Sequence, residues 1–411
     1  MHSSSTRRRV GFGALFSLAT ALALAACSSG GNVKESSSAG GLDAMEPVTF
    51  TVSEPLPPNS VANIANNEFM DYVTKKTNGK VSFEVYDTST LHPMEQALSA
   101  MESGLSDITL YIPGLLASEA PAGAWATGLG GFTTTSPLDM LAGSVAAMSV
   151  YREGAMAAEL AAHNAVYLGG FSSESYSLLC TSPMETLADA KGVLGRSTGG
   201  VYDDEMEAIG MVPNLIDANE VYEGLQRGTV DCQVGPVSTF EKEGLAEVAK
   251  YYTPLPFSPN TGAGYIMNKD KYDGLPDEVK RIFQEAAPLL GRVNRETIKS
   301  FHAWYTTAPE KYDVTFVTPA EDLSSTLADY RGSQAATLAE RAPDSVTDSG
   351  AVVDQFQAVY ADWVKILTDE FNVPKTDGSQ DSALAAYDFV ANEFDWDRYR
   401  VRWYEYLRDL E

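Results

Sequence analysis

Hydrophobic and polar residues form a repeating strand and helix pattern along the first part of the chain. Residues 48–54 and 81–87 alternate with the period of two that is typical of a half-buried strand. Between them, apolar residues recur three and four positions apart, which predicts a helix that ends at Asn78-Gly79. A second helix, ending at Gly104, and a third strand over 105–112 follow. This order predicts a parallel sheet covered by helices.

The same kind of pattern returns after residue 167. Strands are expected at 175–181, 192–197 and 229–235, with helices over 201–209 and 219–228 between them. The pattern predicts an α/β fold of two lobes with a cleft between them. Clefts between domains are favoured places for small-molecule sites. The expected division is 47–170 for lobe 1, 171–270 for lobe 2, and 271–411 for the connecting helix and the C-terminal helices that pack on the lobes.

The first residues carry the pattern of an export signal. Arg7, Arg8 and Arg9 precede an apolar stretch of signal-peptide length, which ends at Cys27 in the sequence Leu-Ala-Ala-Cys. This resembles a bacterial lipobox, and a plain secretory signal is the alternative. We expect a signal peptide over 1–26, lipid attachment at Cys27 and a flexible tether over 27–46. The protein would then be exported and anchored by lipid to the outer face of the cell membrane.

Charge and cysteine content narrow the class further. The chain has a formal net charge of −27, which argues against nucleic acid as a partner. Exposed charges are screened beyond about 8 Å at physiological salt, so a single arginine inside a cleft can still attract an anion. Beyond Cys27, only Cys180 and Cys232 remain. In an exported protein they form either a disulfide or a pair of small buried hydrophobic residues.

The stretch Lys-Gly-Val-Leu-Gly-Arg-Ser-Thr-Gly-Gly, residues 191–200, permits two functions. Ser197 fits the G-x-S-x-G pattern of a serine hydrolase, whereas Arg196 suits the capture of a carboxylate. A hydrolase needs a histidine later in the chain, and only His302 follows, inside a predicted helix. The sequence has no H-E-x-x-H motif, clustered His/Cys ligands or phosphate-binding loop. We therefore expect no enzyme, no metal and no cofactor.

Several motifs in order resemble one protein family. They are KKTNGKVSFEVYDTSTL, MEQALSAMESGLSDI, ADAKGVLGRSTGG, NEVYEGLQRGTVD, EVAKYYT and MNKDKYDGLPDEV. Over about residues 50–301 the chain resembles the extracytoplasmic solute-binding protein of a TRAP transporter, the DctP type. The resemblance implies an α/β, two-lobed periplasmic-binding-protein-like fold, with a ligand cleft between the lobes and a long connecting helix. It also implies capture of a small organic acid and its delivery to TRAP membrane subunits. A solute-binding lipoprotein of an ABC importer and a secreted serine hydrolase are the alternatives.

The resemblance also implies a role for Arg196, which falls on the family arginine that pairs with the ligand carboxylate. A second family arginine is replaced here by Tyr176, so a monocarboxylate or a sugar acid fits at least as well as a C4-dicarboxylate. Tyr111 and Gln233 come from the ends of predicted strands, and Asn219 opens a predicted helix. These three residues are further candidates for ligand contact.

Overall fold

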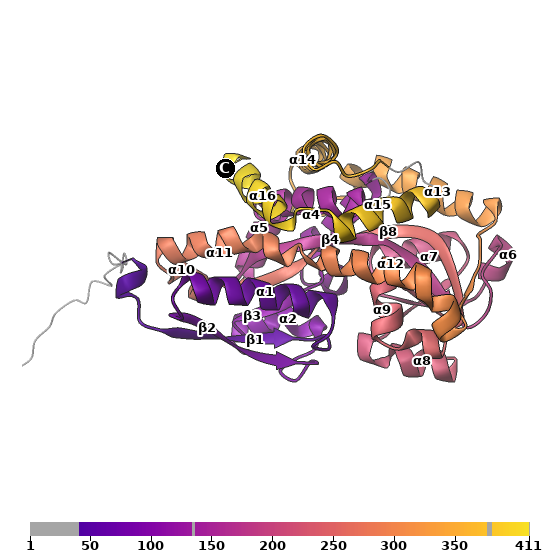
Figure 1. Ribbon diagram of the computed structural model, residues 1–411, viewed down its shortest axis with the longest axis horizontal. Coiled ribbons are helices and arrows are strands. Elements are labelled where there is room, and N and C mark those ends of the chain that lie inside the picture. Colours follow the sequence, from indigo (N-terminus) through magenta and orange to yellow (C-terminus); the bar gives the residue numbers. More distant parts are fainter. Residues whose placement is uncertain (1–40, 134–135, 376–379, 411) are drawn as a thin grey trace, which may run out of the picture. The chain divides into compact units, whose positions relative to one another are not determined.

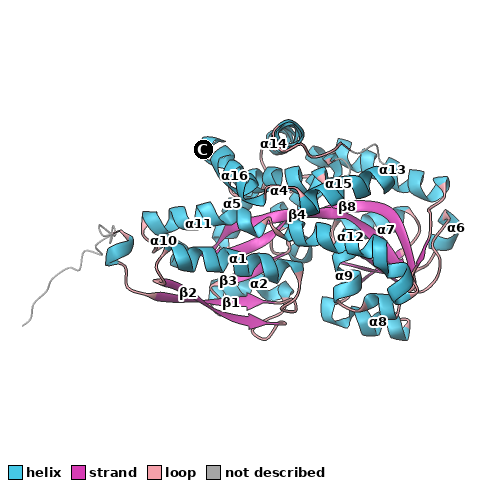
Figure 2. Cartoon of the chain, in the orientation of Figure 1, coloured by secondary structure: helices cyan, strands magenta, loops and turns pink. Residues whose placement is uncertain are grey.

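The computed structural model describes residues 41–133, 136–375 and 380–410, which lie in one compact unit, Gly40–Glu411. The predicted signal peptide and Cys27 lie outside the described residues. Within them, one mixed sheet runs through the unit (Figure 2). Its strands are β1 (Val48–Glu54), β2 (Val81–Asp87), β3 (Ile108–Tyr111), β4 (Ala165–Cys180), β5 (Leu194–Ser197), β6 (Val212–Leu215), β7 (Cys232–Gly235), β8 (Tyr251–Asn268) and β9 (Thr315–Phe316).

The order of the strands explains how one sheet makes two lobes. It reads β2-β1-β3-β8-β4-β7-β5-β6, with β9 added beside β8. At each end, three strands run parallel to one another, and the long antiparallel pair β4 and β8 joins the two groups. β3 pairs with residues 264–267 of β8, whereas β7 pairs with residues 177–180 of β4. The long pair is therefore the connection between lobes.

The long pair bends where it passes between the lobes. Its register shifts several times between Tyr167 and Leu178. Gly262 has φ +84°, and a Cβ there would meet the Tyr151 ring at 2.1 Å. Only glycine combines that backbone angle with so close an approach. The expected boundary at 170/171 falls inside β4, because this strand contributes to both lobes.

Helices cover the sheet as the sequence pattern predicts. In the first lobe they are α1 (Val61–Lys76), α2 (Ala97–Ser103), α3 (Pro121–Ala126), α4 (Leu138–Tyr151) and α5 (Gly154–Ala162). In the second lobe they are α6 (Leu187–Ala190), α7 (Val201–Ala208), α8 (Val221–Arg227) and α9 (Val237–Lys242). α8 ends at Gly228 in the left-handed conformation, φ +72°, as a C-terminal glycine should.

The connecting segment consists of more than one helix. α10 (Lys269–Asp273) leads into α11 (Asp277–Leu290), and α12 (Val293–Tyr312) follows after two residues. The expected single long helix is therefore two helices in sequence (Figure 1). α11 buries an apolar stripe, Val279, Ile282, Phe283 and Ala286, against α1 and β1. α12 packs on α9 and α15.

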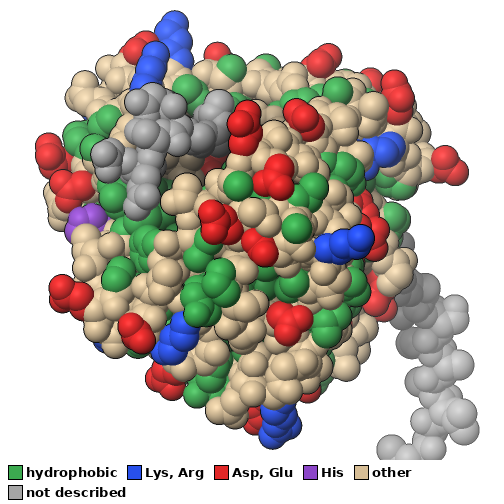
Figure 3. Space-filling view, turned by 90° about the vertical axis from the view of Figure 1, so that its right-hand side faces the viewer, with side chains coloured by type: hydrophobic (Ala, Val, Ile, Leu, Met, Phe, Trp, Pro, Cys, Tyr) green, Lys and Arg blue, Asp and Glu red, His purple; other side chains and the backbone are tan. Residues whose placement is uncertain are grey.

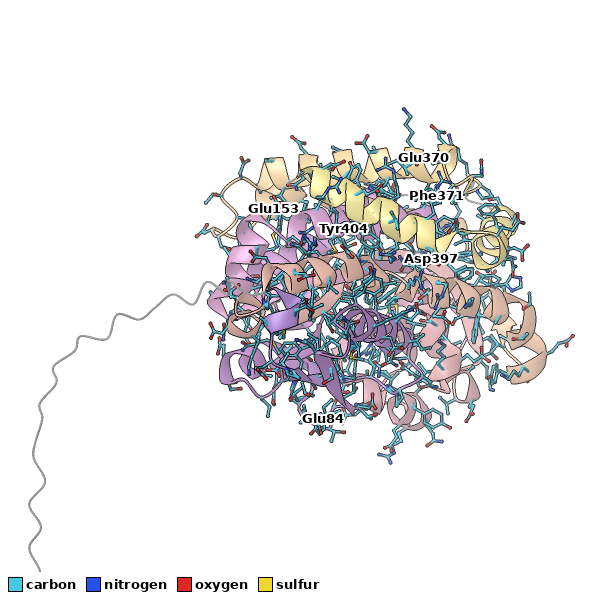
Figure 4. All side chains as sticks on the ribbon, turned by 60° about the vertical axis from the view of Figure 1, so that its left-hand side comes forward. Glu84, Glu153, Glu370, Phe371, Asp397 and Tyr404 are labelled. Carbon is cyan, nitrogen blue, oxygen red and sulfur yellow. A yellow bond between two sulfur atoms is a disulfide. The ribbon has the colours of Figure 1, made fainter. Side chains whose placement is uncertain are left out.

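The C-terminal region forms helices that pack on both lobes, α14 and α16 on the first lobe and α13 partly on the second. They are α13 (Glu321–Ala336), α14 (Ser349–Asp369), α15 (Gln380–Asn392) and α16 (Trp396–Leu410). α14 lies along α4, and its side chains Phe356, Val359 and Trp363 are buried there. Figure 4 shows α16 from Asp397 to Tyr404, beside Glu370 and Phe371. Asp397 pairs with Arg292, which also pairs with Glu68 of α1 at 2.6 Å. The C-terminal helices are thus tied to the connecting segment and the first lobe.

Candidate functional site

A cavity of about 140 Å³ lies between the two lobes. The first lobe contributes residues that follow β1 and β3, and the second lobe contributes β5, β7 and α9. At one rim the lobes touch: a Cβ on Gly199 would meet the carbonyl oxygen of Gly114 at 3.3 Å. Gly199 has φ +81°, which favours glycine independently of that contact. The cavity is therefore closed on this side by backbone from both lobes.

Arg196 enters the cavity because of its place on β5. Successive residues of a strand point to opposite faces of the sheet. Gly195 faces Met206 of α7, where a Cβ would lie 2.5 Å from the sulfur atom. Arg196 consequently points the other way, and it lines the cavity with only 6% of its surface exposed. Its Nε donates to the carbonyl oxygen of Ile216 at 3.3 Å.

The charge of Arg196 is only partly compensated. Among the described residues, no carboxylate oxygen lies within 4.0 Å of its guanidinium, so it forms no ion pair there. Burial lowers the pKa of this guanidinium, while the charge of Glu243 opposes that shift. A buried charge without a close partner is costly, and a bound anion would remove much of that cost. The cavity is therefore suited to a negatively charged group.

Two further predicted residues line the same cavity. Gln233 of β7 is the register partner of Arg196 across the sheet. Tyr176 of β4 lies in the lining with its ring stacked on Tyr202, at 4.7 Å between centroids and 5° between planes. Burial raises the pKa of the Tyr176 hydroxyl, which stays neutral at physiological pH. The structure thus brings Arg196, Tyr176 and Gln233 together.

Tyr111 and Asn219 lie outside the cavity lining. Leu110 and Ile112 line the cavity, so strand alternation turns Tyr111 away from it and into the core beside Gly123. Asn219 belongs to the short 3-10 helix η5 (Ala218–Glu220), where its side chain is exposed and its neighbour Ala218 lines the cavity. Its backbone N–H donates to Asp217 at 2.9 Å. The structure therefore places neither side chain against a ligand in this cavity.

Sequence reasoning missed two acidic residues of the lining, Glu174 and Glu243. Glu174 of β4 is 1% exposed, and burial raises the pKa of its carboxyl to about 8. Glu243 follows α9, and burial raises the pKa of its carboxyl to about 7, against the lowering effect of Arg196. The spacing of two residues between Glu174 and Tyr176 would put both on one face of a regular strand, but the register of β4 shifts between them, so the spacing gave no usable signal. Glu243 gave no signal either.

Ser197 has structural partners in this fold. Its side chain is fully buried, its hydroxyl donates to Asp203, and it accepts the Gly199 N–H at 2.8 Å. His302, the histidine that a hydrolase would need, faces Asp388 at 3.7 Å. The hydroxyl therefore fixes the glycine turn that follows β5, which is the turn that touches the first lobe.

The second lobe contains a disulfide that borders the site. Cys180 of β4 and Cys232 of β7 are register partners, and their sulfur atoms are bonded. The bond ties the strand that carries Tyr176 to the strand that carries Gln233. Within the described residues, no group of three or more His, Cys, Asp or Glu side chains is arranged to hold a metal ion.

A second cavity, of about 470 Å³, lies between α5, α11 and α16. Although it is larger, none of the charged side chains that line it is buried. Its cationic members Arg152, Lys269 and Arg408 keep contact with solvent. The chemistry that can orient a charged solute is therefore found in the cavity between the lobes.

Two lobes joined by long strands, with a buried cation in the cavity between them, define a solute-binding protein. The sequence model of bacterial extracellular solute-binding protein family 7, DctP, matches residues 52–324. The chain belongs to this family, as its motifs predict. Among the described residues, no helix is both long and apolar enough to cross a membrane.

Individual relatives agree with this assignment. The C4-dicarboxylate-binding periplasmic protein DctP of Rhodobacter capsulatus is 27% identical over 248 residues, which are 59% of this chain and 71% of that protein. A TRAP solute-binding protein from Rhodoferax ferrireducens, solved with copurified benzoate, superimposes with a TM-score of 0.68 at 19% identity, covering 78% and 99% of the two chains. The ectoine-binding protein of Halomonas elongata gives 0.65 at 19% identity, covering 77% and 100%.

Proposed function

We propose that the protein captures a small carboxylate-bearing solute between its lobes and delivers it to the membrane subunits of a TRAP transporter. The observation that carries this proposal is Arg196, a buried cation in the cavity with no ion-pair partner among the described residues. A guanidinium offers two parallel N–H donors that match the two oxygens of a carboxylate. Relatives described as binding C4-dicarboxylates and benzoate support the same ligand class.

The long pair β4 and β8 supplies a mechanism for capture. In the open state a solute enters the cleft, and its carboxylate pairs with Arg196. Rotation of the lobes about the connecting strands then closes the cleft. The contact between Gly114 and Gly199 is what a closed rim requires, because side chains at these positions would hold the backbones apart. We keep the division into lobe 1 (47–170), lobe 2 (171–270) and a connecting and C-terminal part (271–411) as part of this proposal.

The cellular setting follows from the sequence and the family. We propose that residues 1–26 are removed and that lipid on Cys27 holds the receptor at the outer face of the membrane. Transport then depends on docking to TRAP membrane subunits, and the receptor itself performs no chemistry on the solute. On the face shown in Figure 3, acidic side chains outnumber basic ones, which gives no support to a nucleic-acid partner.

Replacement of Arg196 tests the function. A panel of organic acids is first screened by thermal shift, and the acids that stabilise the protein are titrated by calorimetry. Because a hydrogen bond to a charged group contributes about 1.5–3 kcal/mol, we expect Arg196→Ala and Arg196→Lys to weaken binding at least about tenfold. Lysine keeps the charge but loses the fork of two donors.

The control for this experiment is Arg227→Ala. Arg227 is exposed on α8 and pairs with Glu223 one turn earlier, at 3.0 Å, so its loss should leave binding unchanged. Unchanged affinity in both Arg196 variants, or turnover of esters abolished by Ser197→Ala, would contradict the proposed function.

A further inference from the structure

The second-lobe wall of the cavity contains two buried oxygen atoms that no described residue satisfies. They are Oε2 of Glu174 and Oε1 of Gln233. Glu174 uses its other oxygen to accept the Val237 N–H at 3.0 Å. Gln233 donates through Nε2 to the carbonyl oxygen of Val234 at 3.0 Å. Its Oε1 is therefore the amide atom that has no hydrogen-bond partner. A buried polar group without a hydrogen-bond partner destabilises the protein, so we expect both oxygens to accept a hydrogen bond from the solute.

Glu243 adds a third acceptor to the same wall. Its carboxylate lines the cavity and makes no hydrogen bond or ion pair with a described residue. It is near enough to Arg196 for the two charges to interact. A solute that carried only a carboxylate would therefore compete with Glu243 for Arg196 and would leave the oxygens of Glu174 and Gln233 without a cation or a donor.

The remaining cation of the lining, Lys242, does not change this balance. It is half-buried at the end of α9, and the acids whose charges act on it are Glu296 and Glu241, both outside the cavity lining. Its charge is therefore compensated from the outer side of α9. Arg196 is therefore the buried cation of a lining that also contains two carboxyl groups and an amide oxygen.

We propose, building on the solute-binding function above, that the natural ligand is zwitterionic: its carboxylate pairs with Arg196, and its protonated nitrogen faces Glu174, Gln233 and Glu243. A protonated nitrogen supplies N–H donors to all three acceptors and a positive charge to the two carboxyl groups. Burial raises the pKa values of Glu174 and Glu243, and a cation in the cavity favours their ionised forms. A hydroxyl group would satisfy the amide oxygen but would leave the two acids without a counter-charge.

Matched ligand pairs test the proposal. Pipecolate and cyclohexanecarboxylate have the same ring size and differ by the ring nitrogen, and proline and cyclopentanecarboxylate form a second pair. Succinate represents the dicarboxylates. Calorimetric titration of the purified protein at pH 7 should show that at least one amino acid of the two pairs binds at least about tenfold more tightly than its carbocyclic partner, and more tightly than succinate.

Two variants make the test specific. Glu174→Gln keeps the shape of the side chain but removes its charge, so the preference for the amino acid should fall at least about tenfold. Glu54→Gln is the matched control, because Glu54 is equally buried but lies outside the cavity lining. It should leave the preference unchanged.

The possible failures can be told apart. If the carbocyclic acids or succinate bind as tightly as the amino acids or more tightly, the zwitterion inference is wrong and the solute-binding function stands. The inference is also wrong if Glu174→Gln and Glu54→Gln have the same effect on the preference. If no organic acid in the panel binds, both the inference and the proposed function are wrong.

Discussion

The two walls of the cavity differ in kind. The first lobe contributes mainly apolar side chains, including Leu56, Met94, Leu110, Ile112 and Leu115. The second lobe contributes charged and polar side chains, including Tyr176, Arg196, Gln233, Lys242 and Glu243. Apolar burial is non-directional, whereas hydrogen bonds and charges fix the orientation of a ligand. The comparison indicates that the second lobe selects the solute and that the first lobe covers it.

Removal of the disulfide between Cys180 and Cys232 has the largest expected effect, because this bond stabilises the polar wall of the second lobe. It joins residues 52 positions apart, and loop closure of that length is expected to contribute about 4 kcal/mol to stability. Cys180→Ala combined with Cys232→Ala should therefore lower the free energy of unfolding by a few kcal/mol. Urea titration followed by tryptophan fluorescence measures the change.

Reduction of the unmodified protein serves as the matched comparison for this prediction. A reductant should destabilise it toward the value of the double variant, whereas the double variant should not respond. Equal stability of the oxidised protein and the double variant would contradict the bracing role. It would also mean that the polar wall is held by its strand pairing alone.

Buried carboxyl groups on the two sides of the molecule provide a second comparison. Burial raises the pKa values of both Glu54 and Glu174 to about 8. Glu54 is satisfied by Asn66 and by Tyr265, whose hydroxyl donates at 3.1 Å, whereas Glu174 keeps one oxygen free. Asp139 of α4 also faces Glu174 and raises its pKa further. The two carboxyl groups are equally buried, but that of Glu54 is satisfied within the core, whereas that of Glu174 has an oxygen left for a ligand.

The sign of the pH effect on stability follows from the raised pKa values. The folded state holds these protons more tightly than the unfolded state, so the stabilisation is complete below about pH 4.5 and is lost as the pH rises through about 8. Each group contributes up to about 1.4 kcal/mol per pH unit in that window. Glu54→Gln and Glu174→Gln should each reduce the slope of the unfolding free energy between pH 5 and 8. Urea titrations at several pH values measure it.

The pH dependence of stability is expected to be alike for Glu54 and Glu174, but the pH dependence of ligand affinity should differ between them. Between pH 6 and 8, pipecolate should bind the unmodified protein more tightly as Glu174 and Glu243 ionise. Glu54→Gln should keep that rise, and Glu174→Gln should reduce it. A rise that is the same in both variants would assign the pH dependence to other groups facing this wall, of which Asp139, Arg196 and Lys242 carry charge.

The sequence predicted the architecture better than it predicted the cavity lining. Strand alternation, helical spacing and Gly228 located the elements because each signal is local. Arg196 and Tyr176, which the motifs indicated, and Gln233, which came from a strand end, all line the cavity. The prediction of Tyr111 was wrong by one position, since its neighbours Leu110 and Ile112 line the cavity. When both faces of a strand are buried, the sequence does not distinguish them.

Glu174 is a residue whose place in the cavity lining could not be predicted from the local sequence pattern. It lies two residues from Tyr176, but the register of β4 and β8 shifts between these positions, so alternation does not assign a face there. Glu243 follows α9 and Arg196 lies on β5, so only the tertiary structure brings the two charges near each other, and no local pattern encodes that. The residues that give the cavity its negative groups are therefore a product of tertiary structure.

Tyr176→Phe has the smallest expected effect and sharpens the comparison of the walls most. The variant keeps the ring stacked on Tyr202 and removes only the hydroxyl, which interacts with Asn260 of the same lining. A neutral hydrogen bond contributes about 0.5–1.5 kcal/mol, so affinity should fall about threefold. Because the hydroxyl is neutral, pipecolate and cyclohexanecarboxylate should lose the same factor in parallel calorimetric titrations. A change in the preference between them would place Tyr176 among the groups that recognise the ligand charge, and the selection attributed to Arg196, Glu174 and Glu243 would then be shared with an uncharged side chain.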